Sequence, residues 1–79
     1  MTPKSFLLTD DLHRYLLAHC APVDAVQQEL IERTEALGQI SGMQVSPEQG
    51  ALLTLLTGLV DATNAVEVGT FTGYSALCI

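Results

Sequence analysis

The chain has 79 residues and a formal net charge of −6, with three lysine and arginine residues against nine aspartates and glutamates. Because nucleic-acid binding requires clustered lysine and arginine, this balance excludes DNA and RNA as expected partners. Hydrophobic residues make up 48% of a chain long enough for only one small domain, which suggests that part of its surface is covered in the intact protein.

Sequence features that direct secretion, membrane insertion or cross-linking are not expected. No apolar core precedes Asp10 and Asp11, as a secretory signal would require. The uncharged run at 49–60 is shorter than the roughly 18 to 20 apolar residues that span a membrane. Cys20 and Cys78 lack the spacing of a disulfide framework or a zinc site. We therefore expect a cytoplasmic protein with reduced thiols and no membrane partner.

The first 45 residues predict two helices and a loop. Residues 10–19 have apolar side chains at helical spacing and follow Thr9, whose hydroxyl can cap the first turn. Pro22 suits the first turn of a second helix, which Gly38 ends. The stretch 39–45 has no periodicity and is expected to be a loop.

A third helix is predicted over 47–62. Ser46 can cap it, Pro47 fits its first position, and Gln49 can act as the capping-box partner. Leucines cover most of its circumference, which is typical of a helix packed between layers. We expect this helix to lie against a sheet.

The last part of the chain changes to a strand pattern. The segment 65–68 is short, β-branched and followed by glycine, and 74–79 is expected to start a helix. Ligands bind where a strand ends in sheets of this α/β class. Because a lone strand leaves its N–H and C=O groups unpaired, we expect the natural protein to continue past Ile79.

The loop after this expected strand carries the clearest binding motif. Gly69 can adopt a backbone conformation closed to other residues, and Gly73 allows close helix packing. Glu67 can accept hydrogen bonds near the sulfonium and ammonium groups of S-adenosylmethionine, whereas the anionic NAD and ATP gain nothing from a carboxylate. The spacing also departs from the G-x-G-x-x-G fingerprint, so a nicotinamide-dependent enzyme is the weaker hypothesis.

The segment 66–75, VEVGTFTGYS, closely resembles the first motif of the caffeoyl-CoA and catechol O-methyltransferase-like family, and 43–50, MQVSPEQG, resembles its second landmark. The order and spacing of the two segments also match, although the family's usual acidic pair is replaced at 46–48. The resemblance implies an α/β fold, as the truncated start of a Rossmann-like class I methyltransferase domain. Residues 1–45 would be a helical cap or oligomerisation region, and 46–79 a helix, the first strand, the cofactor loop and the next helix start.

The resemblance also implies S-adenosylmethionine as the cofactor. The residues that would line its site are Val45, Glu67, Gly69, Thr70 and Ser75, with Met43, Phe71 and Tyr74 close by. Ser75 would hydrogen-bond the carboxylate end of the methionine moiety.

The activity that the resemblance implies is methyl transfer to a hydroxyl of a small aromatic, catechol- or caffeoyl-like acceptor. Mg²⁺ or a similar divalent ion would assist it, in a homodimer. The metal ligands and the catalytic base would lie beyond Ile79, so we predict no catalytic or metal-binding residue in this chain and expect the 79 residues alone to be inactive. His13 and His19, six apart, do not form a helical metal pair. The alternatives are a small helical interaction module, or a non-catalytic fragment without cofactor binding.

Overall fold

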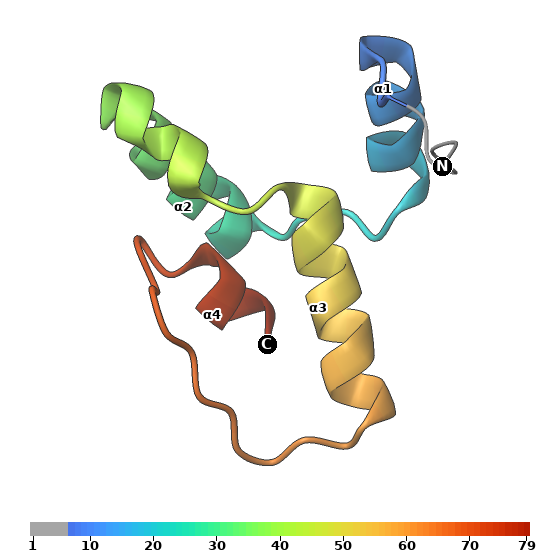
Figure 1. Ribbon diagram of the computed structural model, residues 1–79, viewed down its shortest axis with the longest axis vertical. Helices are drawn as coiled ribbons and strands as arrows, with labels where there is room; N and C mark the ends of the chain where they lie inside the picture. Colours follow the sequence, from blue (N-terminus) through green and yellow to red (C-terminus); the bar gives the residue numbers. More distant parts are fainter. Residues whose placement is uncertain (1–6) are drawn as a thin grey trace, which may run out of the picture.

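The computed structural model describes residues 7–79, which form five helical elements (Figure 1). These are α1 (Asp10–His19), α2 (Ala25–Glu35), the 3₁₀ helix η1 (Gly38–Met43), α3 (Pro47–Leu59) and α4 (Tyr74–Cys78). The short α4 lies between α2 and α3 and contacts both, while α1 contacts α3 (Figure 1). Within residues 7–79, each helix is too short or too polar to span a membrane.

Helix α1 has the predicted bounds. The Thr9 hydroxyl accepts a hydrogen bond from the Leu12 backbone N–H at 3.2 Å, which confirms Thr9 as the cap. Among the described residues, none that belongs to α1 is buried, and its polar link to the rest of the chain is the 3.2 Å contact between His13 Nε2 and Glu48 Oε1. This helix is therefore an outlying element.

Helix α2 begins later than Pro22 suggested. Asp24 Oδ1 accepts from the Gln27 N–H at 2.7 Å, and the Asp24 N–H donates to Gln27 Oε1 at 3.0 Å, which completes a capping box. This reciprocal pair satisfies two free amides, so it determines the start of the helix. Helix α2 ends at Glu35, before the predicted stop at Gly38. Gly38, with a φ of +86°, instead begins η1, which occupies most of the loop expected at 39–45.

Helix α3 begins at Pro47 as predicted, but its expected capping box does not form. The Ser46 side chain makes no capping hydrogen bond to the helix. The helix also ends before the predicted residue 62, because Asp61 adopts a left-handed φ of 52° that cannot continue it.

The strand predicted at 65–68 is absent from the part of the chain that the structure describes. The segment between α3 and α4 runs as a long irregular loop (Figure 1). Val66 and Val68 are 93% and 95% exposed, whereas Glu67 between them is partly buried. The alternation typical of a strand is present, but residues 7–79 offer no second strand to pair its backbone groups. The expected packing of α3 against a sheet is therefore also not seen, and the α/β class stays a prediction.

The small core lies where α3 meets α4. Tyr74 and Cys78 are 2% and 6% exposed, and both pack against Gly50 of α3. A Cβ at position 50 would lie 2.8 Å from Cys78 Sγ and 2.9 Å from Tyr74 Cε1. The Thr54 hydroxyl donates to the Cys78 carbonyl at 2.6 Å and fastens the end of α4 to α3. The absence of a side chain at position 50 thus permits this approach.

Replacing Gly50 with alanine is expected to destabilise the protein, because the added methyl group would overlap Tyr74 and Cys78. Gly58→Ala, in the same helix with no atom within 4 Å of the new Cβ, is the matched control and should be neutral or stabilising. We expect the free energy of unfolding of the Gly50 variant to lie about 1–3 kcal/mol below that of the control in denaturant titrations. Equal effects would contradict this packing of α4.

Glu48 connects α3 to α1 through His13. Burial raises the pKa of Glu48, but hydrogen bonding to its own backbone amide, to Ser46 and to His13 outweighs burial and holds this pKa below the ordinary value of 4.5. The carboxylate is therefore more acidic in the folded protein than in the unfolded chain. Its contribution to stability is present above pH 4.5 and is lost as the pH falls through the lowered pKa.

We therefore expect the unfolding free energy to decrease as the pH falls below 4.5, and Glu48→Gln to weaken that dependence. The effect should stay below about 1 kcal/mol because the pair with His13 is partly exposed. Glu35→Gln, an equal charge change at the exposed end of α2, is the control in urea titrations at several pH values. If both substitutions weaken the pH dependence of the unfolding free energy equally, Glu48 has no special role in it.

Candidate functional site

Two segments that are distant in sequence face one another and enclose a small hollow of about 40 Å³. One comprises the end of η1 with the residues after it, and the other comprises the glycine loop with the start of α4. The hollow is lined by Met43, Gln44, Val45, Gly69, Thr70, Phe71, Tyr74 and Ser75. Apart from Gln44, these are all residues predicted to lie at the cofactor site, so the structure brings them together. Their role in binding stays a prediction.

Glu67, the remaining predicted residue, joins the group through Ser75. The Ser75 hydroxyl donates a hydrogen bond to Glu67 Oε1. The other carboxylate oxygen, Oε2, is buried and has no hydrogen-bond partner within residues 7–79. Leaving a buried acceptor unpaired costs free energy, so this oxygen is suited to receive a donor from a ligand.

The glycine loop owes its shape to positive φ angles at alternate residues. Gly69 and Gly73 have φ angles of +76° and +98°, and Phe71 between them has one of 55°. The Gly73 N–H donates to the Thr70 carbonyl at 3.0 Å and closes the turn. A left-handed conformation costs a phenylalanine about 1–2 kcal/mol, and such strain is concentrated at functional sites. The conformation brings Phe71 to the hollow.

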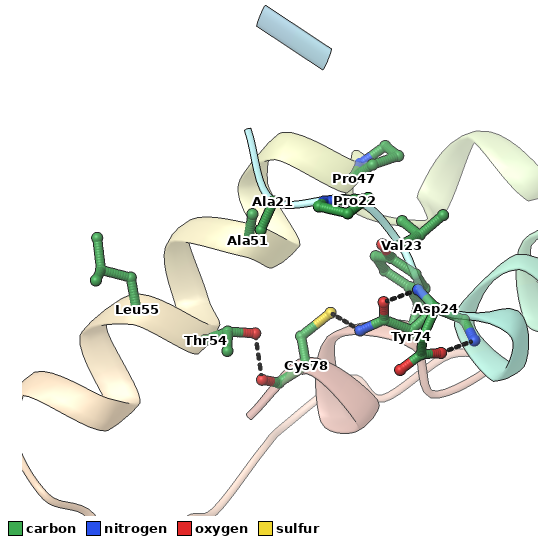
Figure 2. Close-up of a pocket in the computed structure, with 11 residues that line it drawn as sticks. Ala21, Pro22, Val23, Asp24, Pro47, Ala51, Thr54, Leu55, Tyr74 and Cys78 are labelled. Carbon is green, nitrogen blue, oxygen red and sulfur yellow. Dashed lines mark hydrogen bonds between the residues drawn. The ribbon is translucent and has the colours of Figure 1, made fainter. Parts of the chain in front are cut away.

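Tyr74 separates the hollow from a larger cavity of about 410 Å³. Figure 2 shows this cavity, with Tyr74 and Cys78 on α4 opposite Thr54 of α3 and Asp24 before α2. Burial, with the nearby Cys78 and Asp24, raises the pKa of Tyr74 to about 12. Burial also raises the pKa of the Cys78 thiol. The raised pKa values favour the neutral phenol and thiol, which suits two side chains packed in the core.

Metal-binding chemistry is not found within residues 7–79, since no three His, Cys, Asp or Glu side chains there are placed to hold an ion. His13 contacts Glu48, and His19 Nδ1 lies 2.8 Å from the Tyr15 carbonyl oxygen. The two histidines therefore make separate contacts, His13 with α3 and His19 within α1.

Sequence reasoning missed two residues connected to the hollow, Gln44 and Thr34. Gln44 lines the hollow and its amide Nε2 lies 3.2 Å from Thr34 Oγ1. Thr34 is 1% exposed in α2, four residues after Leu30 on the apolar side of the helix. A threonine on an apolar helix stripe was the available signal, because a buried hydroxyl requires partners.

Most of the chain is similar to known O-methyltransferases. A family model described as O-methyltransferase matches residues 18–79. Caffeoyl-CoA O-methyltransferase 1 of Arabidopsis thaliana is 35% identical over 75 residues, which cover 94% of this chain and 29% of that protein. Caffeoyl-CoA O-methyltransferase of Populus kitakamiensis is 38% identical over 77 residues, covering 94% and 33%. Tricin synthase 2 of Oryza sativa subsp. japonica is 35% identical over 79 residues, covering 96% and 26%. The chain thus spans a quarter to a third of these relatives.

Gly69→Ala is expected to loosen the loop, because alanine at a φ of +76° costs about 1–2 kcal/mol. The Gly73 amide should then exchange with solvent faster, as its bond to Thr70 opens more often. Gly42→Ala is the control: at neither glycine would a Cβ meet an atom within 4 Å, and Gly42 has no positive φ. Hydrogen exchange followed by mass spectrometry or NMR measures the difference. Unchanged exchange in the Gly69 variant would disprove that the loop requires a left-handed conformation at position 69.

Proposed function

Because the chain belongs to the O-methyltransferase family, we propose that it supplies part of an S-adenosylmethionine site in an enzyme that methylates a hydroxyl group. The observation that carries the proposal is the buried, unpartnered Oε2 of Glu67 beside a hollow lined by the glycine loop. The acceptor that we propose is a small aromatic molecule of the catechol or caffeoyl type, and the names of the caffeoyl-CoA relatives support this class.

The chemistry of the residues around the hollow fits this cofactor. S-adenosylmethionine carries a sulfonium and an ammonium group, both attractive to a carboxylate such as Glu67. Phosphate-bearing ligands would instead meet a like charge there, and within residues 7–79 no lysine or arginine lines the hollow. A hollow of about 40 Å³ is much smaller than the roughly 300 Å³ or more of ligand pockets. The described residues would therefore form one wall of the site.

In the proposed mechanism this wall of the site binds S-adenosylmethionine and orients it. The cofactor, when bound, supplies an electrophilic methyl group on sulfur. Glu67 accepts a hydrogen bond from the ligand's cationic end, the Ser75 hydroxyl orients the Glu67 carboxylate, and Gly69 lets the ligand approach the backbone. Holding two reactants in line lowers the barrier, because part of the entropy cost of bringing them together is already met on binding.

The rest of the proposed enzyme would come from outside residues 7–79. A divalent ion such as Mg²⁺ would need ligands that the described residues do not group together. The segment 65–68 would become the first strand of a Rossmann-like sheet once a neighbouring strand pairs with it. We also propose a cytoplasmic homodimer, with the N-terminal helices as a cap or as part of its interface.

A helical interaction module is the second candidate. Its support is the apolar surface that α3 leaves exposed, which consists of Leu52, Leu55, Leu56 and Leu59 together with Val60. In this reading the loop at 67–75 is a structural turn, and no cofactor binds.

The test is titration calorimetry with S-adenosylhomocysteine on the full-length gene product, whose intact mass is measured first. We expect binding, and we expect Glu67→Gln to weaken it about tenfold or more, because it removes a charged acceptor worth about 1.5–3 kcal/mol. Glu29→Gln is the matched control, since Glu29 pairs with Arg33 at 2.7 Å on the exposed surface of α2. A mass near 8.4 kDa with no binding would refute the enzyme proposal and favour the interaction module.

A further inference from the structure

The hydroxyl of Thr34 is a buried meeting point of three parts of the chain. Thr34 Oγ1 donates to the Leu30 carbonyl of its own helix at 2.8 Å. It lies 2.8 Å from Thr72 Oγ1 in the glycine loop, and 3.2 Å from Gln44 Nε2 in the segment after η1. A single oxygen thus contacts α2 and both sides of the hollow.

The number of protons determines the direction of these hydrogen bonds. A threonine hydroxyl has one proton to donate and two lone pairs that accept. Because the Thr34 proton goes to the Leu30 carbonyl, the Thr72 hydroxyl and the Gln44 amide are the donors to Thr34. The hydrogen-bonding capacity of Thr34 Oγ1 is then fully used, as a buried polar atom requires.

Both donors belong to walls of the hollow. Gln44 lies between Met43 and Val45 on one wall, and Thr72 lies within the glycine loop of the other. Within residues 7–79, the side-chain hydrogen bonds that connect these two walls pass through Thr34. A displacement of either wall would break a bond to the same buried oxygen.

We propose that Thr34 is a positioning residue, whose hydroxyl holds the glycine loop against the 43–45 segment and so sets the gap that receives the cofactor. Its effect on the cofactor rests on the proposed function, whereas its effect on the loop does not. A residue that only filled space could be replaced by valine, which has the same shape. The three hydrogen bonds require a hydroxyl, which valine lacks and serine keeps.

The matched control is Thr57 of α3. Its hydroxyl also donates to the carbonyl four residues earlier, Leu53, at 2.7 Å. Thr57→Val therefore removes the same local hydrogen bond as Thr34→Val without altering a contact to the hollow. Any difference between the two variants reports the bonds to Gln44 and Thr72.

Hydrogen exchange of the ligand-free, full-length protein is the first measurement. We expect Thr34→Val to speed exchange of the Gly73 amide about tenfold, in line with the cost of leaving buried donors unpaired. Thr34→Ser should restore slow exchange, and Thr57→Val should not alter it. If Thr34→Val and Thr57→Val leave this amide equally protected, the positioning role is disproved, whether or not a cofactor binds.

Calorimetry with S-adenosylhomocysteine is the second measurement. The dissociation constant should rise about tenfold in Thr34→Val and stay within about threefold of wild type in Thr34→Ser and Thr57→Val. A wild-type protein that binds no S-adenosylhomocysteine would overturn the proposed function alone, because the exchange result still decides what Thr34 does to the loop.

Thr72→Val removes the hydrogen bond between Thr72 and Thr34 at the less buried of the two residues, in case the Thr34→Val protein does not fold. It should reproduce the faster exchange and the weaker binding. In the double variant the two effects should not add, because both substitutions delete one shared hydrogen bond. Additive effects would contradict the coupling between Thr34 and Thr72.

Discussion

The close packing of α4 on Gly50 is the contact on which the arrangement of the candidate site depends. Helix α4 has five residues, too few to be stable without tertiary contacts. It is held because Tyr74 and Cys78 fit against a position of α3 that carries no side chain, and because Thr54 binds the Cys78 carbonyl. Since Ser75 follows Tyr74 directly, the packing of Tyr74 also places Ser75 beside Glu67. The site is thus built outward from a packing contact.

The segment 65–68 shows that features set by neighbouring residues can be predicted from the sequence more readily than those set by distant residues. Thr9 and Pro47 were identified correctly as the starts of α1 and α3, because cap residues and proline act within one helical turn. The capping box of α2 at Asp24 is equally local and was overlooked beside the more conspicuous Pro22. A strand is different, since its ladder depends on residues elsewhere in the chain. The β-branched composition of 65–68 indicates a strand, but it does not show which residues would pair with that strand.

In the candidate site, too, residues that belong to local motifs could be predicted, whereas a residue that depends on distant contacts could not. Apart from Gln44, the residues around the hollow were predicted from two short motifs, at 43–50 and 66–75, that resemble those of a known family. Thr34 was missed because its importance comes from contacts with Gln44 and Thr72, ten and 38 positions further along the chain. Neither periodicity nor spacing around a single threonine on an apolar helix stripe identifies partners that lie so far away in the sequence. Hydroxyl networks of this kind are found by counting donors and acceptors in space.

Charge pairing explains why Glu67 is available to a ligand. Within residues 7–79 the two arginines are already occupied, Arg14 with Asp11 and Arg33 with Glu29, each within its own helix. Both Glu48 and Glu67 are partly buried and leave Oε2 unpaired within the described residues, but Glu48 Oε1 has His13 as a partner, whereas Glu67 Oε1 has only the neutral Ser75 hydroxyl. A partly buried carboxylate without a cationic partner attracts a cation more strongly than an exposed one, because less water screens the interaction. The one unbalanced charge beside the hollow therefore favours a ligand that brings its own positive charge, and disfavours the phosphate-bearing cofactors that glycine loops more often bind.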